Sequence, residues 1–281
     1  MTEVIENKSN MKTPLTYYGG KQKMAKTIIE MMPKHRIYCE PFFGGGAVFF
    51  AKPKSYLEVI NDKNDRLVTF YRVIQNHFEE LNDMVQCTLY SESEYRRARK
   101  IYYGNIEATD IEIAWSVWVS INMSFNGSPM GGWKWCNGSA GSLVGVVIRH
   151  KREEFNVYLK QRLQDVQISC REALDVIKNR DSKDTFFYLD PPYPGADQKH
   201  YSGYGFDDLE ELLLILENIK GKFILSNYNS ELLDSYISSN DWNKTEVDMP
   251  LMLANFGNAK SKIKKEVLVS NFIKKENLLF T

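Results

Sequence analysis

The chain has 281 residues, of which 43% are hydrophobic and 26% are charged, proportions that are ordinary for a soluble globular protein. Its 36 basic residues balance its 36 acidic residues, so net charge does not favour a nucleic-acid partner and only local clusters can. The length suits one large α/β domain or one domain with a sizeable insertion, and no apolar run approaches a membrane span.

The chain start and the cysteines bear on cellular location. Residues 1–11 are polar and lack the apolar core of a signal peptide, and residues 1–12 are expected to be disordered. The four cysteines have no spacing typical of a zinc site and are not expected to form disulfides. We therefore expect a protein of the reducing cytoplasm, with no membrane association and no metal site.

The beginning of the chain predicts a strand–loop–helix–strand unit with a glycine-rich first turn. The expected elements are a helix after Gly20 that stops near Pro33, a strand over Ile37–Glu40, a helix over Ala47–Ala51, a strand over Ser55–Ile60 and a helix from about Asn64 to Gln75. From about Arg72 to Asp165 the pattern changes, and we interpret these residues as an inserted helical domain. Helical, charged stretches over Glu92–Tyr103 and Asp110–Ile121 accompany a long loop or hairpin over Asn122–Gly145, which is rich in Gly, Asn, Ser and Trp.

Alternation of strands and helices resumes after the insertion, which indicates an α/β fold. The expected elements are strands over Val166–Ser169, Thr185–Leu189 and Phe223–Leu225, helices over Glu172–Lys178 and Asp207–Ile219, and a terminal strand pair of Thr245–Met249 with Val267–Phe272. No internal repeat is recognisable in the chain.

The string Asp190-Pro191-Pro192-Tyr193 directly follows the apolar run Thr185–Leu189. The run is typical of a buried strand, and the two prolines end it, because neither can donate to a sheet and both fix φ. A carboxylate, two carbonyls and an aromatic ring are thus expected at the carboxyl end of a strand, where open α/β sheets bind ligands. These residues alone leave open an ordinary strand-ending turn.

The string Phe43-Gly44-Gly45-Gly46 lies between a predicted strand and a predicted helix, as a cofactor-binding turn requires. Its spacing differs from the dinucleotide pattern G-x-G-x-x-G, which disfavours a pyrophosphate site. Glu40 ends the strand before the turn, and Asp62 ends the next strand, where a carboxylate can accept hydrogen bonds from ribose hydroxyls. A turn without a ligand and, for Asp62, an N-cap of the following helix stay open as alternatives.

Four strings occur in order along the chain: Tyr17-Tyr18-Gly19-Gly20-Lys21, Glu40-Pro41-Phe42-Phe43-Gly44-Gly45-Gly46, Asn61-Asp62-Lys63-Asn64 and Asp190-Pro191-Pro192-Tyr193. Their array resembles that of the Dam-type (D12 class) DNA adenine-N6 methyltransferases over nearly the whole chain, from Thr13 to Phe272. The resemblance implies a Rossmann-like sheet that binds S-adenosylmethionine, formed by residues 13–71 and 166–281. Residues 72–165 would then be the inserted target-recognition domain.

The resemblance also implies a set of cofactor-binding residues. They are Tyr17, Lys21, Glu40, Phe43, Gly44, Gly46, Asp62 and Asp190. Among them, the string that contains Tyr17 and Lys21 would approach both the cofactor and a flipped base, and Asp62 would bind the ribose hydroxyls. Residues 169–173 match loosely the family's contact with the cofactor adenine.

In the implied reaction, Asp190 and the Pro191 carbonyl accept hydrogen bonds from the exocyclic amine of adenine, whose lone pair is otherwise delocalised into the ring. Each bond to a charged acceptor contributes roughly 1.5–3 kcal/mol and orients the lone pair toward the methyl group. Pro192 and Tyr193 complete the implied catalytic string. The Tyr193 ring would stack on the extruded base, for roughly 1–3 kcal/mol.

The insertion would contact double-stranded DNA, because residues 122–127 resemble the start of the family's recognition hairpin. The implied DNA-binding residues are Asn126, Lys134, Lys260 and Lys262, the last two in a C-terminal loop. The residues after Gly127 depart from members that read GATC, so the recognition sequence stays open. Trp133 and Trp135 either pack on one face of a hairpin or enter the duplex. Basic clusters at residues 96–100, 149–152 and 260–265 are either solvated helix faces or phosphate contacts.

Two other functions stay open at this point. An RNA or protein-side-chain methyltransferase is disfavoured by the long insertion and by Asp190, where enzymes that modify glutamine amides carry Asn. A catalytically inactive DNA-binding relic is disfavoured because Asp190, Tyr193 and the glycines are all present. A cognate restriction endonuclease is a candidate partner, and the protein is expected to be encoded by a bacterium or a phage.

Overall fold

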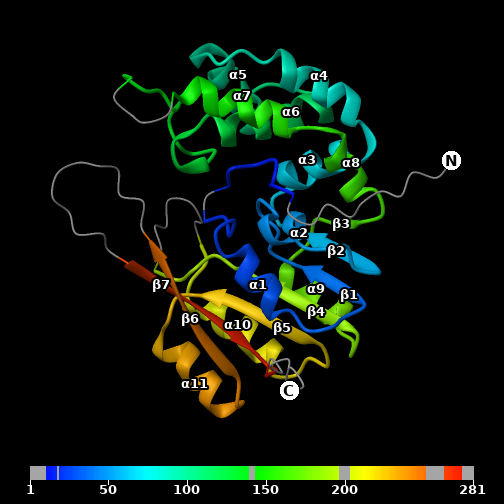
Figure 1. The fold of residues 1–281 in the computed structure, drawn as a ribbon, viewed down its shortest axis with the longest axis vertical. Helices are drawn as coiled ribbons and strands as arrows, with labels where there is room; N and C mark the ends of the chain where they lie inside the picture. The colour runs from blue at the N-terminus through cyan, green and yellow to red at the C-terminus, as the bar shows by residue number, and fades with distance from the viewer. Residues whose placement is uncertain (1–10, 18, 139–142, 196–202, 251–262, 274–281) are drawn as a thin grey trace, which may run out of the picture. The chain divides into compact units, whose positions relative to one another are not determined.

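The computed structural model describes residues 11–17, 19–138, 143–195, 203–250 and 263–273. The chain forms two compact units, residues 1–30 with 43–173 and residues 31–42 with 174–281. Seven strands form a sheet in the order β3-β2-β1-β4-β5-β7-β6, and helices connect many of them (Figure 1). This arrangement confirms the expected α/β class. Within the described ranges, no helix has both the length and the apolar character needed to cross a bilayer.

The first unit combines two strands with a cluster of helices. Its elements are α1 (Ala25–Met31), α2 (Ala47–Ala51), β2 (Leu57–Asn61), α3 (Asp65–Asn76), α4 (Phe78–Cys87), α5 (Glu92–Tyr102), α6 (Asp110–Asn122), the 3-10 turn η1 (Phe125–Gly127), α7 (Val144–Glu154), α8 (Val157–Leu163) and β3 (Gln167–Ser169). Strands β2 and β3 pair in parallel, with Ile60 opposite Ile168. The predicted boundaries of the target-recognition domain at residues 72 and 165 stay a prediction.

Helix α6 lies at the centre of the helical cluster, because every residue from Ala114 to Asn122 is buried. A helix that is buried on all sides must be covered by other elements. Helix α6 packs against α3, α4 and α5, which surround it in Figure 1. A capping box fixes its start: the Thr109 side chain accepts from the Glu112 N–H, and the Glu112 carboxylate accepts from the Thr109 N–H at 2.9 Å.

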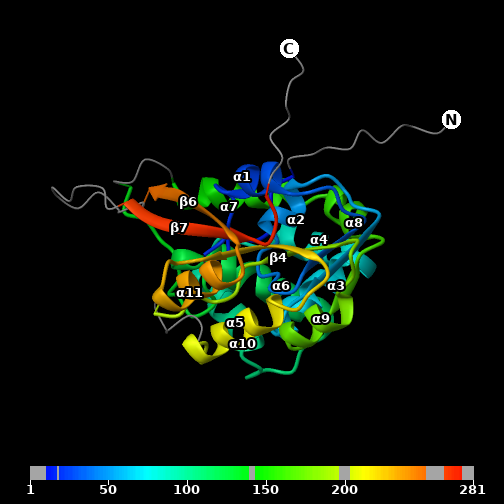
Figure 2. The same ribbon diagram turned by 90° about the horizontal axis from the view of Figure 1, so that it is seen from below.

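The second unit contains the other strands of the sheet. Its elements are β1 (Ile37–Glu40), α9 (Ala173–Arg180), β4 (Thr185–Leu189), α10 (Phe206–Leu216), β5 (Lys222–Asn227), α11 (Glu231–Ser239), β6 (Asn243–Pro250) and β7 (Ile263–Ser270). Strand β4 is parallel to β1 and β5, with Phe187 opposite Cys39 and Phe223. Strand β7 is antiparallel to β5 and β6, and Figure 2 shows β6 and β7 as a long pair. The carboxyl ends of β1, β4 and β5 therefore lie at one edge of the sheet.

Several predicted elements have the expected bounds, among them the strands β1 and β4 and the helix α2. The remaining predicted strands and helices exist with ends shifted by a few residues. The structure adds four helices that the sequence pattern does not predict, α4, α7, α8 and α11.

Candidate active site

The glycine-rich turn of the first unit depends on Gly46, which has φ +65° and lies just before α2. Its N–H donates to the Phe43 carbonyl at 2.8 Å, which closes the turn. A Cβ at Gly46 would lie 2.5 Å from the Phe43 ring. A side chain at this position would therefore force both an unfavourable φ and a steric clash.

Asp62 follows β2, and its carboxylate ties the glycine-rich turn to the next loop. Its Oδ2 accepts from the Gly44 N–H at 2.8 Å, and its Oδ1 accepts from the Asn64 N–H at 2.9 Å. Burial raises the pKa of Asp62, although these backbone N–H groups oppose the shift. The N-cap of α3 is Asn64, whose side chain accepts from the Arg66 and Leu67 N–H groups, so the capping alternative for Asp62 is wrong.

Residues 13–17, which we call the N-terminal strap, lie against the glycine-rich turn. The Thr13 hydroxyl donates to the Gly45 carbonyl, and the Tyr17 ring lies 3.4 Å from where a Cβ at Gly44 would be. The structure therefore brings together Tyr17, Gly44 and Asp62, three of the residues for which cofactor binding is predicted. Lys21 is buried and donates to the Gly19 carbonyl at 2.9 Å, while Tyr18 lies outside the described residues.

The strap also contacts the end of α6. The Thr16 N–H donates to Asn122 Oδ1 at 3.0 Å, and Asn122 Nδ2 donates to the Pro14 carbonyl at 3.1 Å. Gly127 approaches the strap so closely, at φ +65°, that a Cβ there would lie 1.7 Å from the Thr16 carbonyl oxygen. The strap thus joins the glycine-rich turn to the start of the predicted recognition hairpin.

The side chain of Asn61 brings residues 169–173 beside Asp62. Its Oδ1 accepts from the Ser169 hydroxyl at 2.9 Å and from the Arg171 N–H at 3.0 Å, and its Nδ2 donates to the Arg171 carbonyl at 3.0 Å. Asn61 is fully buried, and its role was not predicted from the sequence. The sequence signal that could have found it is a polar residue at the end of an apolar strand. A polar side chain that is buried there needs hydrogen-bond partners.

In the second unit, Asp190 and Tyr193 contact each other directly after β4. The Tyr193 hydroxyl lies 3.0 Å from Asp190 Oδ1, 2.7 Å from Ser226 Oγ and 3.3 Å from Glu266 Oε2. Burial and the negative charges of Asp190 and Glu266 raise the pKa of Tyr193 well above its usual range. The hydroxyl therefore stays protonated and can donate a hydrogen bond. The Tyr193 ring meets the Tyr228 ring edge-on at 4.5 Å between centroids.

Three carboxylates converge on this end of the sheet. Glu40 ends β1, is buried, and accepts from the Tyr38 hydroxyl at 2.6 Å. The other two carboxylates are those of Asp190 and Glu266. Burial and then the negative charges of Asp190, Glu40 and Glu266 raise the pKa of the Tyr188 phenol well above the usual range, so all three carboxylates lie near it. Glu40 and Asp190 are thus neighbours, and Glu266 is a further residue of this cluster that no sequence pattern predicts.

The predicted recognition hairpin is a short loop that folds back on itself. Ser124 and Trp133 form an isolated antiparallel bridge, and the Tyr90 hydroxyl donates to the Lys134 carbonyl. Trp133 is half-buried against the Tyr90 ring, at 5.4 Å between centroids, whereas Trp135 is exposed. The packing interpretation therefore fits Trp133 and does not fit Trp135.

Other residues with predicted DNA contacts are only partly described. Asn126 lies in η1, while Lys260 and Lys262 lie outside the described residues. The basic cluster at residues 149–152 has internal contacts: Lys151 donates to the Thr13 carbonyl at 3.4 Å, and Arg152 donates to the Thr88 carbonyl at 2.9 Å.

The chain matches a family model described as D12 class N6 adenine-specific DNA methyltransferase, over residues 17–126 and 145–249. The chain belongs to this family. Membership makes the protein a DNA methyltransferase, and the sheet described above is consistent with the Rossmann-like fold expected for it. All four strings that carry the sequence resemblance lie inside the matched ranges.

Similar proteins from bacteria and an archaeon are named as type II methyltransferases or as a modification methylase. A type II methyltransferase of Lactococcus lactis subsp. cremoris, M1.LlaDCHI, is 26% identical to this chain. The match covers 97% of this chain and 99% of the relative. The modification methylase StsI of Streptococcus sanguinis is 26% identical over 99% of this chain and 46% of its own length. The type II methyltransferase M.MjaIII of Methanocaldococcus jannaschii is 26% identical over 76% of this chain and 84% of its own length.

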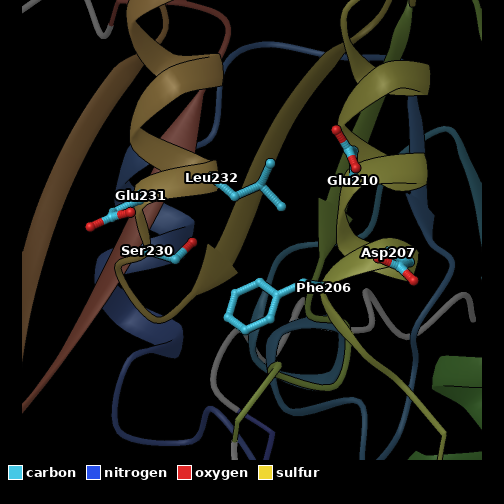
Figure 3. A pocket seen from close by; sticks show the side chains of 6 residues that line it. All are labelled: Phe206, Asp207, Glu210, Ser230, Glu231 and Leu232. Atoms are coloured by element: carbon cyan, nitrogen blue, oxygen red, sulfur yellow. The ribbon is translucent and has the colours of Figure 1, made fainter.

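A separate cavity of about 440 Å³ lies in the second unit, between the starts of α10 and α11. Figure 3 shows the Phe206 ring and the Leu232 side chain beside it, with three carboxylates around them. Those carboxylates, Asp207, Glu210 and Glu231, would repel the phosphates of DNA. None of the predicted site residues lines this cavity.

Proposed function

We propose that this DNA methyltransferase transfers a methyl group from S-adenosylmethionine to N6 of adenine in duplex DNA, after the base is flipped out of the helix. The observation that carries the proposal is the contact between Asp190 and the Tyr193 hydroxyl at the carboxyl end of β4. Family membership supports the substrate, because the family is described as adenine-specific. Base flipping follows from the chemistry, since the amine of a stacked and paired adenine is inaccessible.

The first unit offers groups that fit the cofactor. Each Asp62 oxygen accepts one backbone N–H, and a carboxylate oxygen has room for about one more donor, such as a ribose hydroxyl. The positive φ of Gly44 and Gly46 leaves the backbone open to close approach. We assign cofactor binding to these residues with Tyr17, Lys21 and Phe43. Glu40 and Asp190, which the sequence resemblance adds to this set, belong to the second unit. S-adenosylmethionine, when bound, supplies a methyl group already activated by a positive sulfur.

In the second unit, Asp190 and the Pro191 carbonyl are proposed to accept hydrogen bonds from the two N–H groups of the adenine amine. These bonds direct the nitrogen lone pair and stabilise the positive charge that develops on nitrogen. Asp190 does not need to be a strong base, because the proton becomes acidic only once nitrogen carries the methyl group. Ser226 and Glu266 orient the Tyr193 hydroxyl, and the Tyr193 ring is proposed to stack on the flipped base.

The biological setting is proposed from the relatives. Two of them are named type II methyltransferases and one a modification methylase, so a role beside a cognate restriction endonuclease is the favoured one. Residues 72–165 are proposed to recognise the target and residues 13–71 with 166–281 to carry the reaction. A cytoplasmic location is part of this proposal.

Incubation of the protein with labelled S-adenosylmethionine and mixed-sequence duplex DNA tests the proposal. The expected product is N6-methyladenine, and Asp190→Ala should abolish it while Asp207→Ala, an exposed residue of the acidic cavity, should not. The Tm of Asp190→Ala shows whether the variant is folded. Methylcytosine as the only product, or transfer to RNA or protein but not to duplex DNA, would overturn the proposal.

A further inference from the structure

The basic residues of α5 differ in how they are paired. Arg96 forms an ion pair with Glu92 at 2.7 Å, and Arg97 lies 3.7 Å from Glu112. Arg99 has neither an ion pair nor a guanidinium hydrogen bond with any residue that the structure describes, and its Nε is buried without a partner. A guanidinium carries five N–H donors and is always charged, so this arrangement leaves strong binding capacity unused.

Two tyrosine rings hold the Arg99 guanidinium in place. Its carbon lies 5.9 Å from the centre of the Tyr95 ring and 5.4 Å from that of the Tyr103 ring. At such distances the ring faces attract a cation. The rings therefore restrict the direction of the guanidinium, yet they do not satisfy its N–H donors.

The same two tyrosines fix the recognition loop, residues 123–135. The Tyr95 hydroxyl donates to the Gly131 carbonyl at 2.5 Å, and the Tyr103 hydroxyl donates to the Pro129 carbonyl at 3.0 Å. Burial raises the pKa of Tyr95, so this phenol stays protonated and keeps its donor. Arg99 is thus held beside residues 129–131 of the loop.

The loop next to Arg99 exposes large apolar side chains. Phe125 is 43% exposed, Met130 47% and Trp135 57%. A rigid cation beside exposed apolar groups matches the two kinds of surface that a DNA duplex offers, its charged backbone and its grooves. The overall charge of the chain is zero, so phosphate attraction must come from local cations such as this one.

We propose that Arg99 contacts a DNA phosphate and thereby sets the position of the recognition loop on the duplex. The inference rests on the proposed function, because it names a contact of the same enzyme with its DNA substrate. A planar guanidinium fits a phosphate with two parallel hydrogen bonds, and phosphate contacts fix the register of a protein on DNA without reading its sequence. Tyr95 and Tyr103 are positioning residues for both Arg99 and the loop.

Measurement of duplex binding at several salt concentrations tests this contact, with Arg99→Gln, Arg99→Lys and the matched control Arg96→Gln. Arg99→Gln should weaken binding about tenfold on every duplex and reduce the slope of log affinity against log salt by about 1. Arg99→Lys should restore the slope but not the full affinity, because it keeps the charge and loses the planar fork. Arg96→Gln should change neither quantity.

Binding by Arg99→Gln equal to that of the native protein would overturn the inference, and so would a loss confined to one target sequence, which would indicate base reading. Unchanged cofactor affinity and Tm show that Arg99→Gln is folded. If it does not fold, Arg99→Lys still tests the contact, through a reduced affinity at an unchanged salt slope. If the native protein methylates DNA and Arg99→Gln binds DNA as tightly as the native protein does, this inference is wrong but the proposed function stands. Absence of any DNA binding by the native protein overturns the proposed function as well.

Discussion

A substitution of Glu58 is the most stringent test of the packing in the first unit, because this carboxylate lies between two buried cations. Its carboxylate accepts from Lys52 Nζ, from both terminal nitrogens of Arg162 and from the Ser55 N–H. The side chains of Lys52, Glu58 and Arg162 are only 2%, 1% and 9% exposed. Arg162 also stacks 3.6 Å over the Phe49 ring, so the cluster connects α8 to α2 and β2.

Glu58→Gln should destabilise the protein, because it keeps the shape of the side chain and leaves two cations buried without a counter-charge. Removal of one partner from a buried ion pair costs about 3–5 kcal/mol. For a chain of this size, the lower figure corresponds to a fall in Tm of about 6–12 °C. Replacing Lys52, Glu58 and Arg162 together by Met, Leu and Met should recover much of the loss, since no buried charge then remains.

The pH dependence of the same variant gives an independent check. Burial alone would raise the pKa of Glu58, but hydrogen bonds and charges from Arg162 and Lys52 outweigh it and lower the pKa below the ordinary 4.5. The charged carboxylate therefore stabilises the folded state fully above pH 4.5, and this contribution disappears as pH falls through the lowered folded pKa. The difference in Tm between native protein and Glu58→Gln should shrink over that range.

Urea denaturation and calorimetry at pH 7 and below measure both effects. The matched control is Glu79→Gln, which removes an exposed carboxylate paired with Lys160 at 2.8 Å and should leave Tm nearly unchanged. If Glu58→Gln were as stable as this control at pH 7, the reasoning about uncompensated buried charge would be refuted.

Three further substitutions test the candidate site. Gly46→Ala places a Cβ 2.5 Å from the Phe43 ring at φ +65°, so Tm and cofactor affinity by calorimetry should both fall; normal values for both would contradict the role of the turn. Asn122→Ala removes the hydrogen bonds that hold the strap at Thr16 and should cost about 1–3 kcal/mol in urea denaturation, whereas a neutral result would show that the strap is held by packing alone. Tyr193→Phe keeps the ring and removes the hydroxyl, so kcat should fall at unchanged cofactor Kd; an unaltered kcat would exclude a role for the hydroxyl network.

Local patterns predicted the elements that carry the site. The apolar run over Thr185–Leu189 forms β4, and the two prolines end it, because backbone chemistry at those positions leaves no alternative. The capping box of Thr109 and Glu112 marks the start of α6 in the same way. In contrast, α11 is not predicted, although its N-cap Ser230, whose side chain accepts from the Leu233 N–H, is a sequence signal that could have found it.

Contacts across the sheet could not be predicted, because no short-range pattern encodes them. Ser226 and Glu266 reach the Tyr193 hydroxyl from 33 and 73 residues away, on strands β5 and β7. Glu266 follows two lysines, Lys264 and Lys265, so the sequence indicates a solvated position. Its burial follows from the position of β7 between β5 and β6, which places this strand inside the sheet.

The N-terminal strap has a consequence for how the protein folds during synthesis. Its hydrogen-bond partner Asn122 follows Thr16 by 106 residues, so the strap leaves the ribosome long before α6 exists. Contacts between residues so far apart form late, because the chain must first lose the entropy of the intervening loop. Residues 13–17 therefore wait for residues made about a hundred positions later before they are fixed against the glycine-rich turn.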